Sequence, residues 1–334
     1  MNCSASQYDT QCWVIAEVAR IPPVYNSRML QPCLCLAVLI AVLAGCAAPE
    51  RHTAVQWEPI EITLSSARDY DWWEFPVTAR FVHSGSGREL TLEGYWTGPR
   101  AYSVRFAAPL AGAWRYETRS DDSRLNGRSG VVEVAAPEPD AISENPNLRG
   151  QIRIAAGGRT FEYADGTPFF LLADTLWAGN TARAGLGENQ DGPFFEHLAD
   201  RKRKNFSAVL MQMFHGFGDY PEDPTGHRNE GGHLFIDREF ARLNPDFFAF
   251  TDRRWKALWE RGWVVASPVC WWGKTKTCRF EPEEAERLAA YLAVRYGSFN
   301  TLWAVSGEYQ YVFRDCGWSE QDLNRIGEAI QRHN

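Results

Sequence analysis

No basic stripe runs through this chain of 334 residues, whose formal net charge is -7 with both signs mixed throughout. Nucleic acid is therefore not an expected partner. Cysteine and histidine nowhere stand at the spacing of zinc ligands, so we expect neither a metal ion nor another cofactor. The length and the 45% hydrophobic content are enough for sizeable cores and suggest two domains.

The sequence has little that could cross a membrane. The apolar run at residues 33–45, "CLCLAVLIAVLAG", is too short for a comfortable span. It ends in small residues and Cys46, which is typical of a bacterial lipoprotein signal whose cysteine is lipidated after cleavage. We therefore expect residues 1–46 to be a leader, with an ordinary signal peptide or a membrane anchor as the alternatives. Residues 1–28 fit neither a signal nor a domain, and an over-extended start would explain them.

A lipoprotein of this kind is exported and held by its lipid at the periplasmic or cell-surface face of a bacterium. Cleavage before Cys46 would leave three further cysteines, Cys270, Cys278 and Cys316. An exported site permits disulfides. With Cys46 acylated, one of the three must be free. The pair Cys270–Cys278 is the local candidate, and Cys316 could replace either member.

Residues 54–136 have the rhythm of short strands. Apolar and polar residues alternate in several segments, and turn sequences such as "SGSG" and "DDSRLNGRSG" separate them. This pattern predicts a small antiparallel β-sandwich. The expected strands are residues 60–64, 76–82, 89–96, 102–107, 113–119 and 130–134. Residues 137–150, rich in proline, asparagine and acids, are expected to be a linker.

Residues 151–334 change to a rhythm of strand, loop and helix. Gly157-Gly158 and Asp165-Gly166 predict two hairpin turns near the start. Four strand–helix units follow, with near-continuous apolar strands, which predicts a parallel sheet covered by helices. The expected strands are residues 169–174, 206–214, 263–269 and 301–306, and the expected helices are residues 192–205, 245–262, 281–297 and 319–333, the last capped by Ser319.

Two folds have this rhythm, a doubly wound sheet and a (β/α)8 barrel of the TIM type. No Gly-rich phosphate turn follows the first strand, which weakens the nucleotide-binding, doubly wound alternative. A complete barrel takes about 250 residues, and fewer follow Phe169. We therefore expect a multidomain chain, a β-sandwich followed by the first half of a barrel, truncated after the fourth unit or recorded in part.

Functional groups of parallel α/β sheets gather at the carboxyl ends of the strands. Polar or aromatic residues stand at all four expected ends: Asp174 and Trp177, then His215, then Trp271 and Trp272, then Glu308 and Tyr309. Each has an alternative role, because Asp174 could cap a turn, His215 could be solvated, and the tryptophans could be core. Glu308 could be a structural acid paired with Arg314. Fourteen tryptophans are also typical of carbohydrate-handling proteins, in which sugar faces stack on aromatic rings.

The segments "YADGTPFFLLADTLWAG", Tyr163 to Gly179, and "LWAVSGEY", Leu302 to Tyr309, resemble the apiosidase-like family of glycoside hydrolases. The preceding "WEPIEITL", "EGYWTG" and "GAWRYETRSDDSRLNG" resemble the small β-sandwich often found before such barrels. The resemblance covers roughly Gln56 to Asn334. It implies a (β/α)8 barrel in which Glu308, in a Gly-Glu pair after the fourth strand, is one of two catalytic carboxylates. It also implies that Asp174 binds substrate.

Glycoside cleavage needs two carboxylates, and the family's second one comes from a later strand than the fourth. If so, this chain lacks it, and we expect the intact parent to be an enzyme and this chain alone to be inactive. The predicted function is that of an exported glycoside hydrolase acting on polysaccharide side chains. The alternative is a non-catalytic carbohydrate- or matrix-binding surface lipoprotein in which the β-sandwich supplies adhesion.

Overall fold

The computed structural model describes residues 50–213, 228–237, 241–269 and 280–334. Ala47 to Asn334 form one compact unit, separate from Met1 to Cys46. Among the described residues, no helix has both the length and the apolar character that crossing a membrane requires. The predicted lipidation site Cys46 lies outside the described residues.

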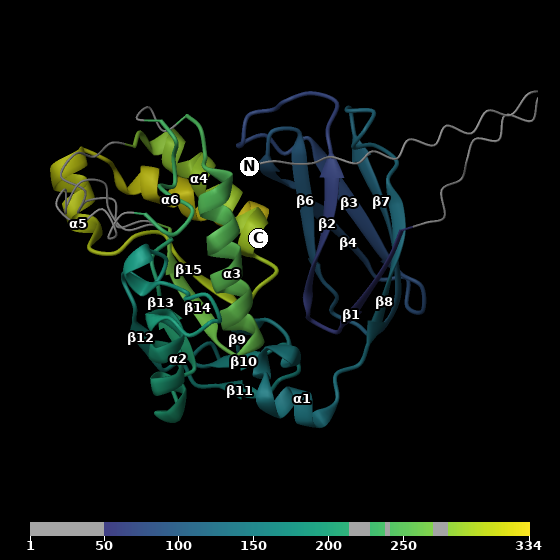
Figure 1. Ribbon diagram of the computed structural model, residues 1–334, viewed down its shortest axis with the longest axis horizontal. Coiled ribbons are helices and arrows are strands. Elements are labelled where there is room, and N and C mark those ends of the chain that lie inside the picture. Colours follow the sequence, from purple (N-terminus) through teal and green to yellow (C-terminus); the bar gives the residue numbers. More distant parts are fainter. Residues whose placement is uncertain (1–49, 214–227, 238–240, 270–279) are drawn as a thin grey trace, which may run out of the picture. The chain divides into compact units, whose positions relative to one another are not determined.

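The first part of the compact unit consists of two sheets (Figure 1). One has the order β1-β8-β7-β3-β4 and the other the order β2-β6-β5. Alternate side chains of both sheets enter one core, which includes Phe81, Phe106 and Trp114. The strands are β1 (Glu50–Val55), β2 (Pro59–Ser65), β3 (Val77–His83), β4 (Glu89–Glu93), β5 (Tyr95–Gly98), β6 (Ala101–Ala107), β7 (Gly112–Ser120) and β8 (Ser129–Ala135).

This arrangement confirms a β-rich first region and corrects two details of the prediction. The strand expected at residues 89–96 is two strands in different sheets, divided at Gly94. A Cβ on Gly94 would come within 2.6 Å of Val77, so the chain crosses between the sheets where only glycine fits. β1 was not predicted, and it pairs parallel to β8, so the first sheet is not purely antiparallel.

The segment expected to be a linker has structure of its own. It contains α1 (Pro139–Glu144) and the 3-10 helix η1 (Pro146–Arg149). The buried Asn147 donates from Nδ2 to the carbonyl oxygens of Trp259 and Trp263, at 2.9 and 3.1 Å, and accepts from Asn300 at 2.8 Å. These hydrogen bonds hold η1 against Trp259, Trp263 and Asn300 of the second part.

Replacing Asn147 by alanine should therefore lower the free energy of unfolding by about 1–3 kcal/mol, since it leaves buried carbonyl groups without donors. Urea unfolding followed by tryptophan fluorescence would measure the change. Asn189, which is exposed, provides the control, and Asn189→Ala should shift the value by less than about 0.5 kcal/mol. Equal losses in the two variants would contradict the anchoring role.

A small antiparallel sheet opens the second part. β9 (Ile152–Ile154), β10 (Phe161–Tyr163) and β11 (Pro168–Phe169) pair in the order β11-β10-β9. Gly158 and Gly166 have φ values of 69° and 87°, so both predicted hairpin turns are confirmed at residues that favour the left-handed region. Tyr163 and Phe169 pack with Ala208 and Val264 in a separate small core, which covers one end of the next sheet.

That next sheet has four parallel strands in the order β12-β13-β14-β15. The strands follow their sequence order without the reversal that a doubly wound sheet requires, so the structure excludes that alternative for these four strands. They are β12 (Ala173–Thr175), β13 (Ala208–Leu210), β14 (Val264–Pro268) and β15 (Thr301–Ala304). Each is shorter than the apolar segment that predicted it.

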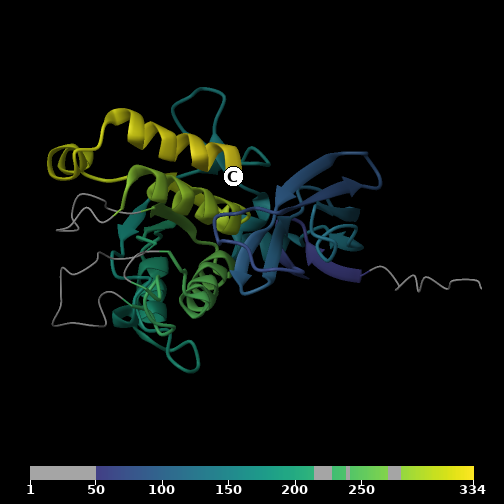
Figure 2. The same ribbon diagram turned by 90° about the horizontal axis from the view of Figure 1, so that it is seen from above.

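Helices follow each strand, at the places the sequence predicted. α4 and α6 lie side by side (Figure 2). Ser319 caps α6 and forms a reciprocal capping box with Asp322, as its position before an acidic first turn predicts. The helices are α2 (Pro193–Arg203), α3 (Pro245–Glu260), α4 (Pro282–Tyr296) and α6 (Glu320–His333), with the short α5 (Tyr309–Tyr311) and the π-helix η5 (Val312–Cys316) after β15.

The aromatic residues between β2 and β3 pack against the second part. Trp72 donates from Nε1 to the carbonyl oxygen of Ala241 at 2.9 Å, and its ring lies 5.6 Å from that of Tyr291 on α4. The guanidinium of Arg287 lies 4.9 Å from the ring of Trp73, and the ring of Phe75 lies 5.0 Å from that of His333, tilted by 35°. These side chains thus serve as packing surface within the chain.

Candidate functional site

The carboxyl ends of β12–β15 are the place where the sequence predicts a site. Side chains alternate between two faces along these strands. Val209 and Val265, adjacent in the register, lie in the main core. Their neighbours Leu210 and Ala266 face the opposite side and are half-buried. This second face is the one that Ala173 and Thr175 of β12 share, and both of these are exposed.

Glu308 stands just beyond the carboxyl end of β15. It is exposed, and its backbone has φ 48° and ψ 43°, in the left-handed region. The carbonyl oxygen of Glu308 accepts from the amide of Tyr311 at 2.9 Å and begins α5. A non-glycine residue in this region costs about 1–2 kcal/mol. The chain therefore tolerates local strain where the prediction places a catalytic carboxylate.

Arg314, the alternative partner of Glu308, is engaged with its own neighbours along the chain. Arg314 donates from Nε and Nη2 to the carboxylate of Asp315, and its guanidinium lies 4.7 Å from the ring of Tyr311. The Asp315 carboxylate is thereby stabilised, which lowers its pKa, since the hydrogen bond from Arg314 outweighs partial desolvation.

Two aromatic side chains predicted to contact sugar are partly exposed. Trp177 follows β12 and is 37% exposed, while its neighbour Leu176 packs against the main core. Tyr309, next to Glu308, is 57% exposed, and its ring lies 5.6 Å from that of Phe313. Both rings thus keep surface that a ligand could cover, so sugar contact remains a prediction for each.

Asp174 has a different environment from the one predicted. It lies within β12, opposite Val209 in the register, so its side chain is on the helix-covered face. Its Oδ2 accepts from Nε of Arg201 on α2 at 2.5 Å. Nε2 of His197 lies 3.2 Å from the same oxygen, at an angle that forms no hydrogen bond. This geometry gives Asp174 a structural role, because its oxygen is already paired with α2, but the role is an ion pair and not the turn cap that was the alternative.

The charges around Asp174 also affect its neighbours. Burial lowers the pKa of His197, and the adjacent charge of Arg201 lowers it further, which together outweigh the attraction of Asp174. The surroundings of His197 therefore favour its neutral form. Three other predicted residues, His215, Trp271 and Trp272, lie outside the described residues, so their placement at the rim stays a prediction.

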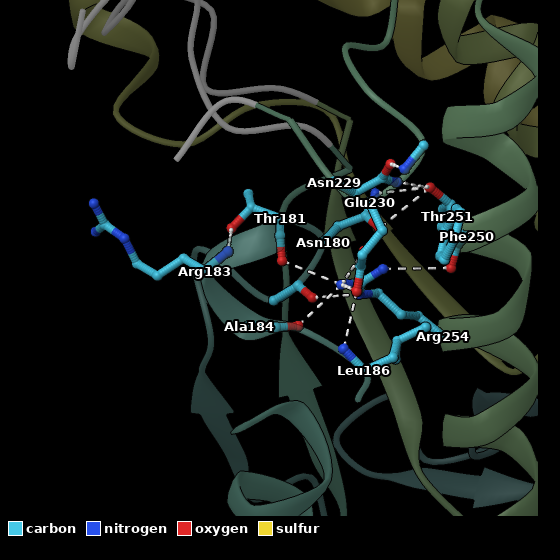
Figure 3. A network of polar contacts seen from close by, with 12 residues as sticks. Asn180, Thr181, Arg183, Ala184, Leu186, Asn229, Glu230, Phe250, Thr251 and Arg254 are labelled. Atoms are coloured by element: carbon cyan, nitrogen blue, oxygen red, sulfur yellow. Dashed lines mark hydrogen bonds and ion pairs between the residues drawn. The ribbon is translucent and has the colours of Figure 1, made fainter. Parts of the chain in front are cut away.

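A buried polar network lies beneath the loop that follows β12, and sequence reasoning missed it (Figure 3). Asn180 of this loop donates to the carbonyl oxygen of Met213 and accepts from Oγ1 of Thr251 on α3 at 3.2 Å. Arg254, one turn along α3, donates to carbonyl oxygens of the same loop. In the sequence, Arg254 is one of two adjacent arginines in an amphipathic helix, and nothing local marks it as the buried one.

A cavity of about 380 Å³ lies elsewhere, between β2 and α3. Its lining includes Glu61, Arg105, Asp252 and Phe299. Phe299 precedes β15, so this cavity is toward the amino ends of the strands and apart from Glu308. Among the residues the structure describes, no group of three or more histidine, cysteine or acidic side chains is arranged to hold a metal ion.

A model of the apiosidase-like catalytic domain matches residues 155–334, which is more than half of the chain. The chain belongs to the apiosidase-like family. The match confirms the resemblance that the segments ending in Gly179 and Tyr309 predicted. A model of a domain of unknown function, DUF5060, matches residues 53–121, within the β-rich first region.

Two of the solved structures that match this chain are described as glycoside hydrolases, and the first of them shares its fold. A candidate glycoside hydrolase from Bacteroides vulgatus ATCC 8482 superposes with a TM-score of 0.66 and 22% identity, over 84% of this chain and 54% of that one. A family 5 glycoside hydrolase from the same organism superposes with a TM-score of 0.45 and 18% identity, over 56% and 38%. The apiosidase-like chain thus spans about half the length of the first structure. Among curated proteins, none matches this chain.

Proposed function

We propose that this apiosidase-like chain is part of an exported glycoside hydrolase that acts on the side chains of complex polysaccharides, with Glu308 as the general acid/base. One observation supports this above the others. Glu308 is an exposed residue with a strained backbone conformation, four residues beyond the end of β15, the fourth of four parallel strands. Strain of this kind tends to occur at functional sites, because ordinary folding gives no reason to retain it.

In the same proposal, β12–β15 are the first half of a (β/α)8 barrel. Their parallel pairing in sequence order supports this, since consecutive strands of such a barrel are neighbours. The small core around Tyr163 and Phe169 would then close the bottom of the barrel. The carboxyl ends of the strands, where Glu308 stands, would form its open mouth.

Glu308 would donate a proton to the glycosidic oxygen as the bond to the leaving group breaks. The developing charge on the sugar requires a second carboxylate, about 5 Å away for retention of configuration and about 6.5–9.5 Å away for inversion. The partly exposed rings of Trp177 and Tyr309 would stack on sugar faces, because these have apolar C–H patches. Trp271 and Trp272 are proposed for the same role.

The alternative, a binding lipoprotein, is less well supported. Its β-sandwich would need exposed aromatic rings to hold carbohydrate. Within the described residues, the large apolar side chains that are exposed all follow residue 150: Ile154, Phe170, Leu171, Trp177, Ile236 and Tyr309. In the β-sandwich region, Trp72 and Trp73 are packed against other parts of the chain.

Release of sugar from a plant polysaccharide tests the proposal. Pectin would be incubated with the protein in its complete barrel, and soluble products would be separated by chromatography. The proposal predicts free sugars that are absent when Glu308 is replaced by glutamine. Retention of the protein on pectin without any product would support the binding alternative instead.

We also propose export and lipidation at Cys46. Cys316 is disulfide-bonded, and such bonds are typical of exported proteins. Metabolic labelling with radioactive palmitate in a bacterial host should place label on the protein, and Cys46→Ala should remove all of it. Cys35→Ala, within the apolar run, is the control and should keep the label. Equal labelling of both variants would contradict lipidation at Cys46.

A further inference from the structure

A fully buried cation holds the loop that leads away from β12. The rim loop, residues 177–186, begins at Trp177 and ends at Leu186. Arg254 of α3 is 0% exposed, and its Nε donates to the carbonyl oxygen of Gly179 at 2.8 Å. Its Nη2 donates to the carbonyl oxygens of Thr181 and Ala184, at 3.1 and 2.9 Å (Figure 3). Because a guanidinium is planar and rigid, this one side chain fixes the spacing of three carbonyl groups.

Glu230 binds both Arg254 and the end of the rim loop. Its Oε2 lies 2.9 Å from Nη2 of Arg254. Its Oε1 accepts from the backbone amide of Leu186 at 2.9 Å. The ion pair therefore contacts both the carbonyl groups within the rim loop and the amide at its end.

A second set of contacts ties the rim loop to the neighbouring strand. Asn180 donates to the carbonyl oxygen of Met213, three residues beyond β13, and to Oγ1 of Thr251. Asn229 donates to the carbonyl oxygen of Phe247 at 2.8 Å, next to the same threonine. The carboxyl ends of β12 and β13 are thus fixed relative to each other through α3.

A buried ion pair contributes little net stability, because the free energy lost when both charges leave water offsets their attraction. Burial lowers the pKa of Arg254, and the charge of Glu230 opposes that shift. Apolar residues of similar volume would often be as stabilising. Such a residue could not bind three carbonyl groups and fix their direction. The pair is therefore better explained by the single loop conformation it imposes.

We propose that Arg254 and Glu230 are a positioning pair for the substrate cleft, holding the rim loop so that Trp177 presents its ring to a saccharide at the mouth. They touch no substrate themselves. This inference rests on the proposed function, because it takes the carboxyl ends of the strands to be the sugar-binding face. The exchange measurement below is independent of that assumption.

Hydrogen exchange in Arg254→Met and Arg254→Lys tests the hold on the loop. Lysine keeps the positive charge but lacks the planar set of N–H donors that a guanidinium provides. Backbone amides of residues 178–186 should exchange at least about tenfold faster in both variants, while those of β7 stay unchanged. Arg253→Met is the matched control. Arg253 is adjacent and exposed, with its guanidinium 5.0 Å from the ring of Phe250, and its loss should leave the loop amides unchanged within about twofold.

Hydrolysis of aryl glycosides by the complete barrel provides the second readout. In Arg254→Lys we expect KM to rise about tenfold with kcat within about threefold and the pH profile unchanged, since substrate positioning is lost and the acid is intact. If the Arg254 variants do not fold, Glu230→Gln, at the partly exposed partner, replaces them in both measurements. Unchanged loop exchange, or faster exchange with an unchanged KM, would overturn the proposal. A wild-type protein without hydrolysis would contradict the proposed function, and loop exchange would still decide whether the pair holds the loop.

Discussion

Replacement of Glu308 by glutamine should lower the rate of the proposed glycoside hydrolysis by the full-length protein about 10²–10⁴-fold, the range that a general acid/base contributes. Glutamine keeps the size and polarity of the side chain but cannot donate the proton to the glycosidic oxygen. Because protonation matters most when the leaving group is poor, the loss should be largest for aryl glycosides with weakly acidic phenols. A series of aryl glycosides with different leaving groups measures this dependence.

Two further variants separate the loss of the acid group from the effect of the strained backbone at Glu308. Glu308→Gly should lose the same activity while raising the free energy of unfolding by up to about 1 kcal/mol, because glycine adopts the left-handed conformation without strain. Glu320→Gln, at an exposed acid of α6, should keep its rate within about twofold. A loss independent of the leaving group, or near-normal turnover in Glu308→Gln, would contradict the assignment of Glu308 as the acid.

Replacement of Asp252 by asparagine should destabilise the fold by about 3 kcal/mol. The Asp252 carboxylate accepts from Nε and Nη2 of Arg295, at 3.1 and 2.6 Å, and lies 3.4 Å from Nη2 of Arg105. Both arginine side chains are only 4% exposed. The substitution would leave the buried Arg295 without its counter-ion and Arg105 with Glu61 alone, and removal of one partner from such a group costs about 3–5 kcal/mol. Asp252 is 24% exposed, so we expect the lower end of this range.

The effect of Asp252 should depend on pH in a defined direction. Desolvation alone would raise its pKa, but the charges of Arg295 and Arg105 outweigh it and hold the pKa below the ordinary value. The stability it contributes is therefore complete above about pH 4 and is lost as pH falls through the folded-state pKa. The difference between wild type and Asp252→Asn should narrow below about pH 4.

Urea unfolding of the two proteins across this pH range measures the difference. Glu260→Gln, on the same helix, is the control, because Glu260 is exposed and its pairing with Lys256 spans 3.8 Å. That variant should change the free energy of unfolding by less than about 0.5 kcal/mol. A difference that stays constant from pH 7 to pH 3 would rule out the charge of Asp252 as the cause.

Asp252 also explains why the two parts of the chain stay joined. Arg105 belongs to β6 and Arg295 to α4, so the carboxylate of α3 links the first region to two helices of the second. Arg105 in addition donates to Glu61 at 3.1 Å and to the carbonyl oxygen of Arg295. The first region is thus a structural support for the helices that cover β12–β15, which agrees with the inward packing of Trp72.

Local features of the sequence were enough to predict the four parallel strands and the four long helices of the second part. The capping box at Ser319, the proline at the start of α3 and α4, and the glycines of the hairpin turns act within a few residues of their own position. The succession of near-continuous apolar strands and helices then indicated which segments pair in parallel. The motif around Gly307 and Glu308 is also contiguous in the sequence, so it could indicate the family without knowledge of the tertiary structure.

Tertiary structure alone decided which side chains near the strand ends stay exposed and which are paired with other elements. Asp174 follows an apolar run like a rim residue, but the register against Val209 turns it toward Arg201 of α2. Gly94 divides a continuous β-like segment because Val77, distant in sequence, leaves no room for a side chain. Arg254 and its exposed neighbour Arg253 look alike in the sequence and differ only in the carbonyl groups that surround them once the chain has folded. Hydrogen bonds and close contacts between distant segments have no signature in either segment alone, so only the folded chain reveals them.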